Sequence, residues 1–96
     1  MYVTSSEMLR SARENGYAVP AFNAENLEMV QGIIQAAEDM RSPVMIQTTP
    51  STVRYMTLYE AVAMVRSMAR RTDVPVALHL DHCPSFVGVY EAIREG

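Results

Sequence analysis

The sequence predicts an α/β fold in which three short strands pair in parallel and alternate with helices. Three observations support this prediction. Residues 17–22, 43–47 and 75–80 are apolar runs of strand length that lack the polar alternation of a half-exposed strand, which indicates burial on both faces. Each run is followed by a segment with helical periodicity. The connections are short, so right-handed strand–helix–strand crossovers are expected.

The first expected elements are a helix and an irregular strand. Residues 4–7 have the form of a capping box, and the helix that follows shares one apolar face among Met8, Leu9 and Ala12. Asn15 and Gly16 are typical of a helix end. In the first strand, over residues 17–22, Pro20 lacks an N–H group, which favours an edge or irregular strand.

Three more helices are predicted. The helix over residues 24–40 carries an apolar side made of Leu27, Val30, Ile33, Ile34 and Ala37. The next helix is expected to begin at a capping box, residues 57–60, and its clear helical spacing involves Leu58, Ala61, Val62, Val65, Met68 and Ala69. Pro84 suits the first turn of the last helix, whose inner face is expected to consist of Phe86, Val89, Tyr90 and Ile93.

This alternation leaves two architectures open, a doubly wound sheet and part of a (β/α)₈ barrel. Periodicity alone does not choose between them. In both architectures the ligand site lies beyond the carboxyl ends of the strands. The candidate functional residues are therefore Asn23, residues 47–52 and residues 81–83.

Composition excludes several classes of function. The 96 residues suit one small domain, and the net charge of −3 gives no basic surface for nucleic acid. The single cysteine cannot form an intramolecular disulfide, and no apolar stretch reaches the ~20 residues of a membrane span. The first residues lack the apolar core of a secretory signal. We therefore expect a cytoplasmic protein with no nucleic-acid or membrane partner.

The third strand ends in His79-Leu80-Asp81-His82, where histidine and carboxylate side chains cluster. In an extended strand His79 and Asp81 share one face, whereas His82 points to the other face at the strand tip. An imidazole beside a carboxylate at a strand end suits metal-assisted proton transfer. The same residues are compatible with a structural histidine and with an aspartate that caps the next helix.

Four sequence blocks extend this interpretation. They are YAVPAFN at residues 17–23, NLE at 26–28, SPV at 42–44 and VALHLDH at 76–82. In their order and spacing they resemble the class II, zinc-dependent ketose-bisphosphate aldolases, a group that contains the fructose- and tagatose-bisphosphate enzymes. The resemblance runs from Tyr2 to Gly96. It implies that residues 1–96 are an amino-terminal helix and the first three βα units of an incomplete (β/α)₈ barrel, all within one barrel domain.

The resemblance also implies a reaction and two central residues. A ketose 1,6-bisphosphate, fructose or tagatose, would be cleaved reversibly to dihydroxyacetone phosphate and glyceraldehyde 3-phosphate with Zn²⁺ as cofactor. His82 matches a zinc ligand of the family. Asp81 matches the acid/base that acts at the hydroxyl, or aldehyde oxygen, of the cleaved bond. The chain contains no lysine, which agrees with a mechanism that uses no Schiff base.

Asn23 and Thr49 match family positions near the substrate. Each has another reading, because Asn23 is also suited to cap the following helix and Thr49 to form the turn before Pro50. His79 is interpreted as structural, and Cys83 as a small buried residue on which catalysis does not depend.

A complete barrel takes ~250 residues. The remaining zinc ligands and the phosphate-binding loops are therefore expected outside residues 1–96, and this chain alone is expected to be inactive. The resemblance further implies a homo-oligomer, a dimer or tetramer, at full length. The alternative is a non-catalytic structural or interaction module derived from the same barrel.

Overall fold

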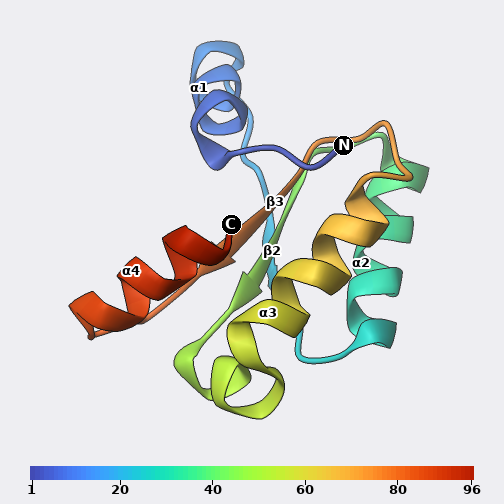
Figure 1. Ribbon diagram of the computed structural model, residues 1–96. Coiled ribbons are helices and arrows are strands. Elements are labelled where there is room, and N and C mark those ends of the chain that lie inside the picture. The colour runs from blue at the N-terminus through green and yellow to red at the C-terminus, as the bar shows by residue number, and fades with distance from the viewer.

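The computed structural model describes residues 1–96 and contains four helices and three strands (Figure 1). In chain order they are α1 (Ser5–Asn15), β1 (Ala21–Asn23), α2 (Leu27–Met40), β2 (Val44–Thr48), α3 (Pro50–Ala69), β3 (Val76–Leu80) and α4 (Phe86–Glu95). The strands form one sheet in the order β1-β2-β3, and both pairings are parallel, as the sequence predicts. None of the helices is both long and apolar enough to cross a membrane.

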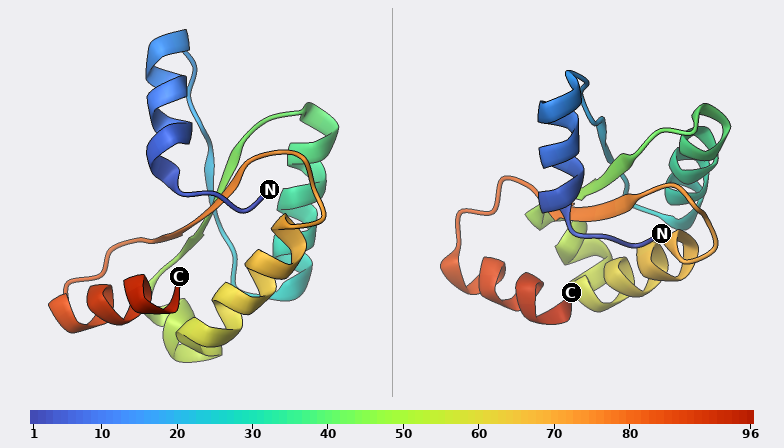
Figure 2. Two further views of the ribbon diagram at one scale, coloured as in Figure 1. Left: turned by 45° about the horizontal axis from the view of Figure 1, so that its top comes forward. Right: turned by 90° about the horizontal axis from the view of Figure 1, so that it is seen from above.

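The helices are arranged as in a barrel wall and not as in a doubly wound sheet. Seen from above, α2, α3 and α4 lie around one side of the sheet, and α1 lies on the other side (Figure 2, right). The face that would point into a barrel carries no βα helix. The chain is thus a helix followed by the first three βα units of an incomplete (β/α)₈ barrel, which confirms the fold prediction.

The side chains of β2 separate these two faces. Val44, Ile46 and Thr48 are buried against the helices, whereas Met45 and Gln47 are only half-buried on the open face. The core on the helix side contains Ala24, Val30, Ile34, Ala37, Val44, Ile46, Val65, Ala69 and Val76. Because Gln47 is in register with Asn23 on β1 and His79 on β3, these three residues form a row across the open face.

The expected starts of the first strand and the second helix were wrong. The first strand covers Ala21–Asn23 and not residues 17–22, although the carbonyl of Pro20 still accepts a bond of 2.9 Å from the Met45 N–H. Proline has no N–H to donate, so regular pairing starts only after it. The second helix begins at Leu27 and not at residue 24, because the side chain of Asn26 caps it by accepting from the Met29 N–H. Thr4 precedes α1 without the predicted side-chain cap.

The third helix starts eight residues earlier than expected, and Thr57 interrupts it. It begins at Pro50 with Thr49 as its N-cap, in a capping box with Thr52. Thr57 has φ 61° and ψ 162°, so the helix is kinked there. The residues after Thr57 do form the apolar helix that the spacing predicts, and the Thr57 hydroxyl donates to the Glu60 carboxylate.

In a helix an alanine variant is usually more stable than a glycine variant, and the backbone conformation of Thr57 predicts the opposite order at this position. This φ,ψ region is essentially restricted to glycine, and a side chain there costs on the order of 1–3 kcal/mol. Both Thr57→Gly and Thr57→Ala remove the hydroxyl, so their difference isolates the strain on Cβ. We expect the glycine variant to unfold at higher urea concentration than the alanine variant.

The matched control is Ser67, an exposed residue within the helical part of α3. There Ser67→Ala should be more stable than Ser67→Gly by the usual ~1 kcal/mol helix preference. If the two positions give the same order, Thr57 is not strained in the folded protein.

The last helix differs most from its prediction. Pro84 lies before the helix, and Ser85 is the N-cap. The supposed inner face is largely exposed, with Phe86 84% and Ile93 74% accessible. The outer edge of β3 has one short partner, a bridge from Tyr2 to Val76, so no further strand covers these side chains.

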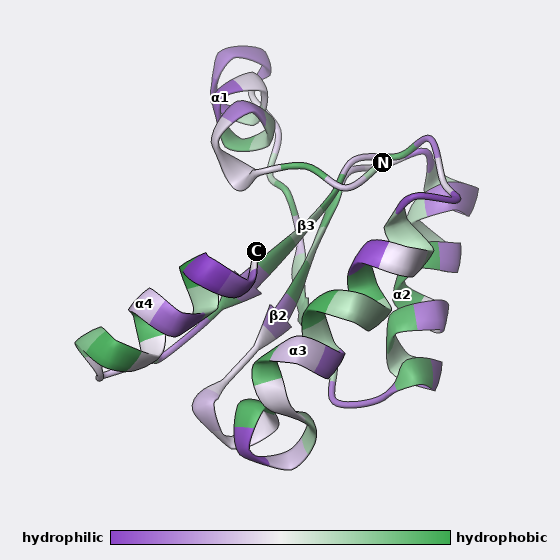
Figure 3. Cartoon of the chain, viewed as in Figure 1, coloured by the Kyte–Doolittle hydropathy of each residue, from purple (hydrophilic) through white to green (hydrophobic).

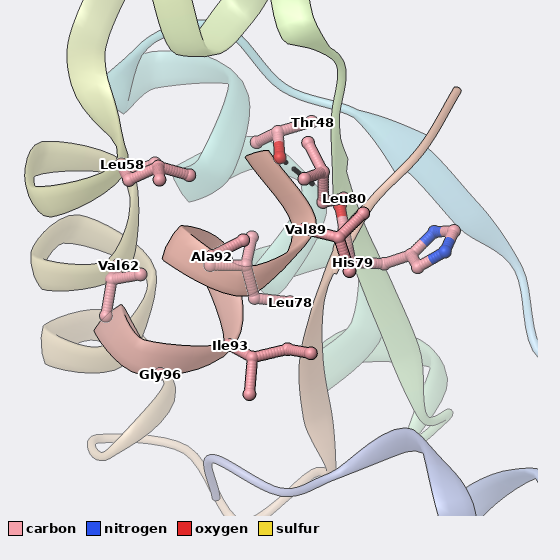
Figure 4. A pocket seen from close by; sticks show the side chains of 11 residues that line it. Thr48, Leu58, Val62, Leu78, His79, Leu80, Val89, Ala92, Ile93 and Gly96 are labelled. Carbon is pink, nitrogen blue, oxygen red and sulfur yellow. Dashed lines mark hydrogen bonds between the residues drawn. The ribbon is translucent and has the colours of Figure 1, made fainter. Parts of the chain in front are cut away.

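Figure 3 colours several segments of α4 as hydrophobic, and the side chains of Phe86 and Ile93 in this helix are exposed. Between α4, α3 and β3 lies an apolar cavity of about 280 Å³. Leu58 and Val62 line it from α3, Leu78 and Leu80 from β3, and Val89 and Ala92 from α4 (Figure 4). The ring of His79 points away from this cavity, toward the open face of the sheet (Figure 4).

Candidate active site

The carboxyl ends of the three strands bring four polar side chains into contact around one glutamine. Nε2 of Gln47, on the central strand, donates to Oδ1 of Asn23 at 3.1 Å and to Oδ2 of Asp81 at 2.7 Å. Nδ1 of His79 lies 3.3 Å from Oε1 of the same glutamine. One amide thus joins β1, β2 and the end of β3.

The position of Asp81 is fixed by its own backbone. Its N–H donates to the Thr48 carbonyl at 2.7 Å, which continues the ladder between β2 and β3 by one residue. Its side chain is 29% exposed and faces the same side of the sheet as His79, as alternation requires. The alternative role as a helix cap is excluded, because α4 is capped by Ser85.

His82 departs from strand geometry. Its φ of 54° places it in the left-handed region, which ends the strand and turns the chain. Strand alternation therefore does not apply to it, and the expectation that it points to the opposite face was wrong. Its Nε2 lies 3.4 Å from Oδ2 of Asp81, and its side chain is 83% exposed. An imidazole and a carboxylate thus stand together at the rim.

Asn23 and Thr49 are placed differently from each other. Asn23 lies in β1 and bonds with Gln47, and the cap of α2 is Asn26, so Asn23 is not a helix cap. Thr49 directly follows β2 at the same rim, but it caps α3 and contacts the hydroxyls of Ser51 at 2.7 Å and Thr52 at 3.2 Å. No hydrogen bond joins Thr49 to the cluster around Gln47.

The donor chemistry of the side chains fits only part of a metal site. Residues 1–96 contain no group of three or more histidine, cysteine, aspartate or glutamate side chains placed to hold one ion. A catalytic zinc takes three protein ligands, among which imidazole is common. The exposed imidazole of His82 fits the role of one such ligand, and Asp81 beside it leaves a carboxylate at the same place.

Gln47 is the site residue that sequence reasoning did not single out. Only its position at a strand end brought it within the candidate range 47–52. Its partners lie 24 and 34 positions away in the chain, so only the register of the parallel sheet brings them together. Register between parallel strands is not encoded in any local pattern.

The fold and the rim together define a class of protein. In (β/α)₈ barrel enzymes the active site lies at the carboxyl ends of the strands, which is where the carboxylate, imidazole and amide groups lie here. A sequence profile described as "Fructose-bisphosphate aldolase class-II" matches residues 3–96. The chain belongs to the class II fructose-bisphosphate aldolase family.

The chain matches part of two longer relatives. It is 45% identical to the fructose-bisphosphate aldolase of Thermus caldophilus over 96 residues, which is 100% of this chain and 31% of that enzyme. The crystal structure of the YdjI aldolase from Escherichia coli K12 covers all of this chain with a TM-score of 0.90 and 33% identity. This chain corresponds to 38% of the YdjI chain, so it spans about a third of the relatives it matches.

Proposed function

We propose that residues 1–96 are the amino-terminal part of the barrel domain of a zinc-dependent aldolase. The complete protein would cleave a ketose 1,6-bisphosphate, fructose or tagatose, reversibly to dihydroxyacetone phosphate and glyceraldehyde 3-phosphate. The observation that carries this proposal is the contact of Asp81 with His82 at the strand-end rim. The printed name of the Thermus caldophilus relative supports the substrate class.

The cofactor in this proposal is Zn²⁺, with His82 as one ligand and the other ligands outside residues 1–96. When bound, the metal would act as a Lewis acid that polarises the ketone oxygen of the substrate. Residues 1–96 alone would be inactive, because His82 and its neighbours do not make three ligands. They also contain no lysine for a Schiff base.

Each of the other residues has a proposed task. Asp81 would accept the proton of the substrate hydroxyl during cleavage and return it to the aldehyde oxygen during condensation. Asn23 uses its Oδ1 to accept from Gln47, which leaves its Nδ2 group to donate to a substrate oxygen. The hydroxyl of Thr49 would bind the substrate at the end of β2. The complete protein would be a cytoplasmic homo-oligomer, a dimer or tetramer.

The test uses a complete barrel that contains residues 1–96. This is either the full-length protein or a chimera in which these residues replace the matching segment of the Thermus caldophilus enzyme, with the parent enzyme as control. We expect cleavage of fructose or tagatose 1,6-bisphosphate with a kcat of about 1–10³ s⁻¹. Chelation should abolish this activity and zinc should restore it.

The assay also addresses the alternative, a non-catalytic module. A zinc-loaded complete barrel that unfolds cooperatively but cleaves neither bisphosphate would overturn the proposed function. Activity that survives complete removal of the metal would overturn the cofactor assignment.

A further inference from the structure

We propose that Gln47 is a positioning residue that holds the carboxylate of Asp81 in its reactive orientation. The inference rests on the proposed function, since it assigns Gln47 a role in the same proton transfer. It is carried by the contacts of a single amide with three neighbouring side chains, those of Asn23, Asp81 and His79.

The carboxylate of Asp81 determines the orientation of this amide. An ionised carboxylate only accepts hydrogen bonds, so the amide atom 2.7 Å from Oδ2 must be the NH₂ group. The second proton of that group is directed to Oδ1 of Asn23 at 3.1 Å. The carbonyl oxygen of the amide then faces Nδ1 of His79, which must therefore carry a proton and donate. Both N–H protons and the oxygen of the amide are thus used.

The amide is itself held by rigid structure. Gln47 lies in the central strand and pairs with β1 on one side and β3 on the other. The main-chain carbonyl of Gln47 accepts a hydrogen bond of 3.0 Å from the Ala24 N–H. A group built on a paired strand is held more closely than a group on a loop, and a misplacement of about 1 Å at a reacting group can cost about 10²-fold in rate.

The contacts also distinguish the two oxygens of Asp81. Gln47 and His82 both approach Oδ2, at 2.7 and 3.4 Å, and no protein group donates to Oδ1. Without Gln47 the carboxylate is free to rotate about its terminal bond. With Gln47 present, Oδ2 is occupied and Oδ1 is left to exchange the proton with the substrate.

Gln47→Met removes the amide and keeps the length of the side chain. In the zinc-loaded complete barrel we expect kcat for cleavage to fall about 10- to 100-fold, the range of a hydrogen bond to a charged group, with KM changed less than about threefold. The zinc content should not change. Gln47→Glu should be at least as impaired, because it replaces the donor by a second carboxylate beside Asp81.

Gln35 provides a matched control. Its Nε2 donates to Oδ1 of Asp39 at 3.0 Å on the exposed surface of α2, which is the same kind of bond away from the site. Gln35→Met should leave kcat unchanged. If Gln47→Met is equally silent, or lowers kcat only by losing zinc or by unfolding, the proposal is wrong.

A double substitution separates positioning from a general structural effect. If Gln47 acts through Asp81, adding Gln47→Met to Asp81→Ala should lower kcat less than about twofold further. If the losses of kcat caused by the two single substitutions multiply in the double variant, the inference is wrong, whereas the aldolase assignment is unaffected. A zinc-loaded complete barrel that contains the unsubstituted residues 1–96 but has no aldolase activity would instead overturn the proposed function.

Discussion

Asp81→Ala should lower kcat for bisphosphate cleavage about 10²–10⁴-fold in the complete barrel while leaving its zinc content unchanged. This is the typical contribution of a positioned general acid–base group. Asp81 shares its Oδ2 with Gln47 and His82 at the rim, so its removal deletes a proton acceptor and leaves the imidazole in place. Substrate affinity should change little, because the proposed metal ligand and the amide of Asn23 remain.

Two further measurements sharpen this prediction. In the Asp81→Ala variant, the rate of proton exchange between dihydroxyacetone phosphate and solvent should fall less than the rate of carbon–carbon cleavage, because a different group outside residues 1–96 is proposed to move that proton. Asp39→Ala is the control, because Asp39 is an exposed carboxylate that accepts from a glutamine in the same way as Asp81. If Asp81→Ala loses its zinc, Asp81 holds or orients the metal, and the assignment of roles is wrong.

The fold was readable from the sequence because its signals are local. Val44, Ile46 and Val76 of the predicted apolar runs are buried on the helix side, and helical periodicity identifies the covering helices. The ends of elements were less accessible, because single residues decide them. Asn26 and Thr49 cap their helices with side-chain hydrogen bonds. Neighbouring polar residues in the sequence were equally suited to this role, so the sequence did not identify the caps.

The site was readable only in part for a related reason. The cluster at residues 79–82 is contiguous, so chemistry alone drew attention to it. Histidine is enriched in the left-handed region, but only a small fraction of non-glycine residues adopt it, so the residue type alone did not predict the conformation of His82. That conformation reverses the direction that alternation gives. The bonds of Gln47 depend on strand register, which no local pattern specifies. The part of the site that could not be predicted from the sequence therefore consists of the unusual backbone conformation of His82 and the long-range contacts of Gln47.

His82→Ala should abolish both zinc binding and cleavage, which distinguishes it from Asp81→Ala. Substitution of a residue that only orients a ligand typically costs about 10- to 100-fold in metal affinity, so loss of a ligand itself should cost more than about 100-fold. The measurement is zinc content after dialysis against a metal buffer, with kcat determined on the same sample.

The other histidine of the chain supplies the contrast. His79 donates to Gln47 from the open face of β3 and is proposed to be structural, so His79→Asn should retain zinc because asparagine keeps a donor. A His82→Ala variant that retains both zinc and activity would place the metal elsewhere in the protein. In that case the contact between His82 and Asp81 would be a surface ion pair, and the chemistry of this rim would have to come from Asp81, Gln47 and Asn23 alone.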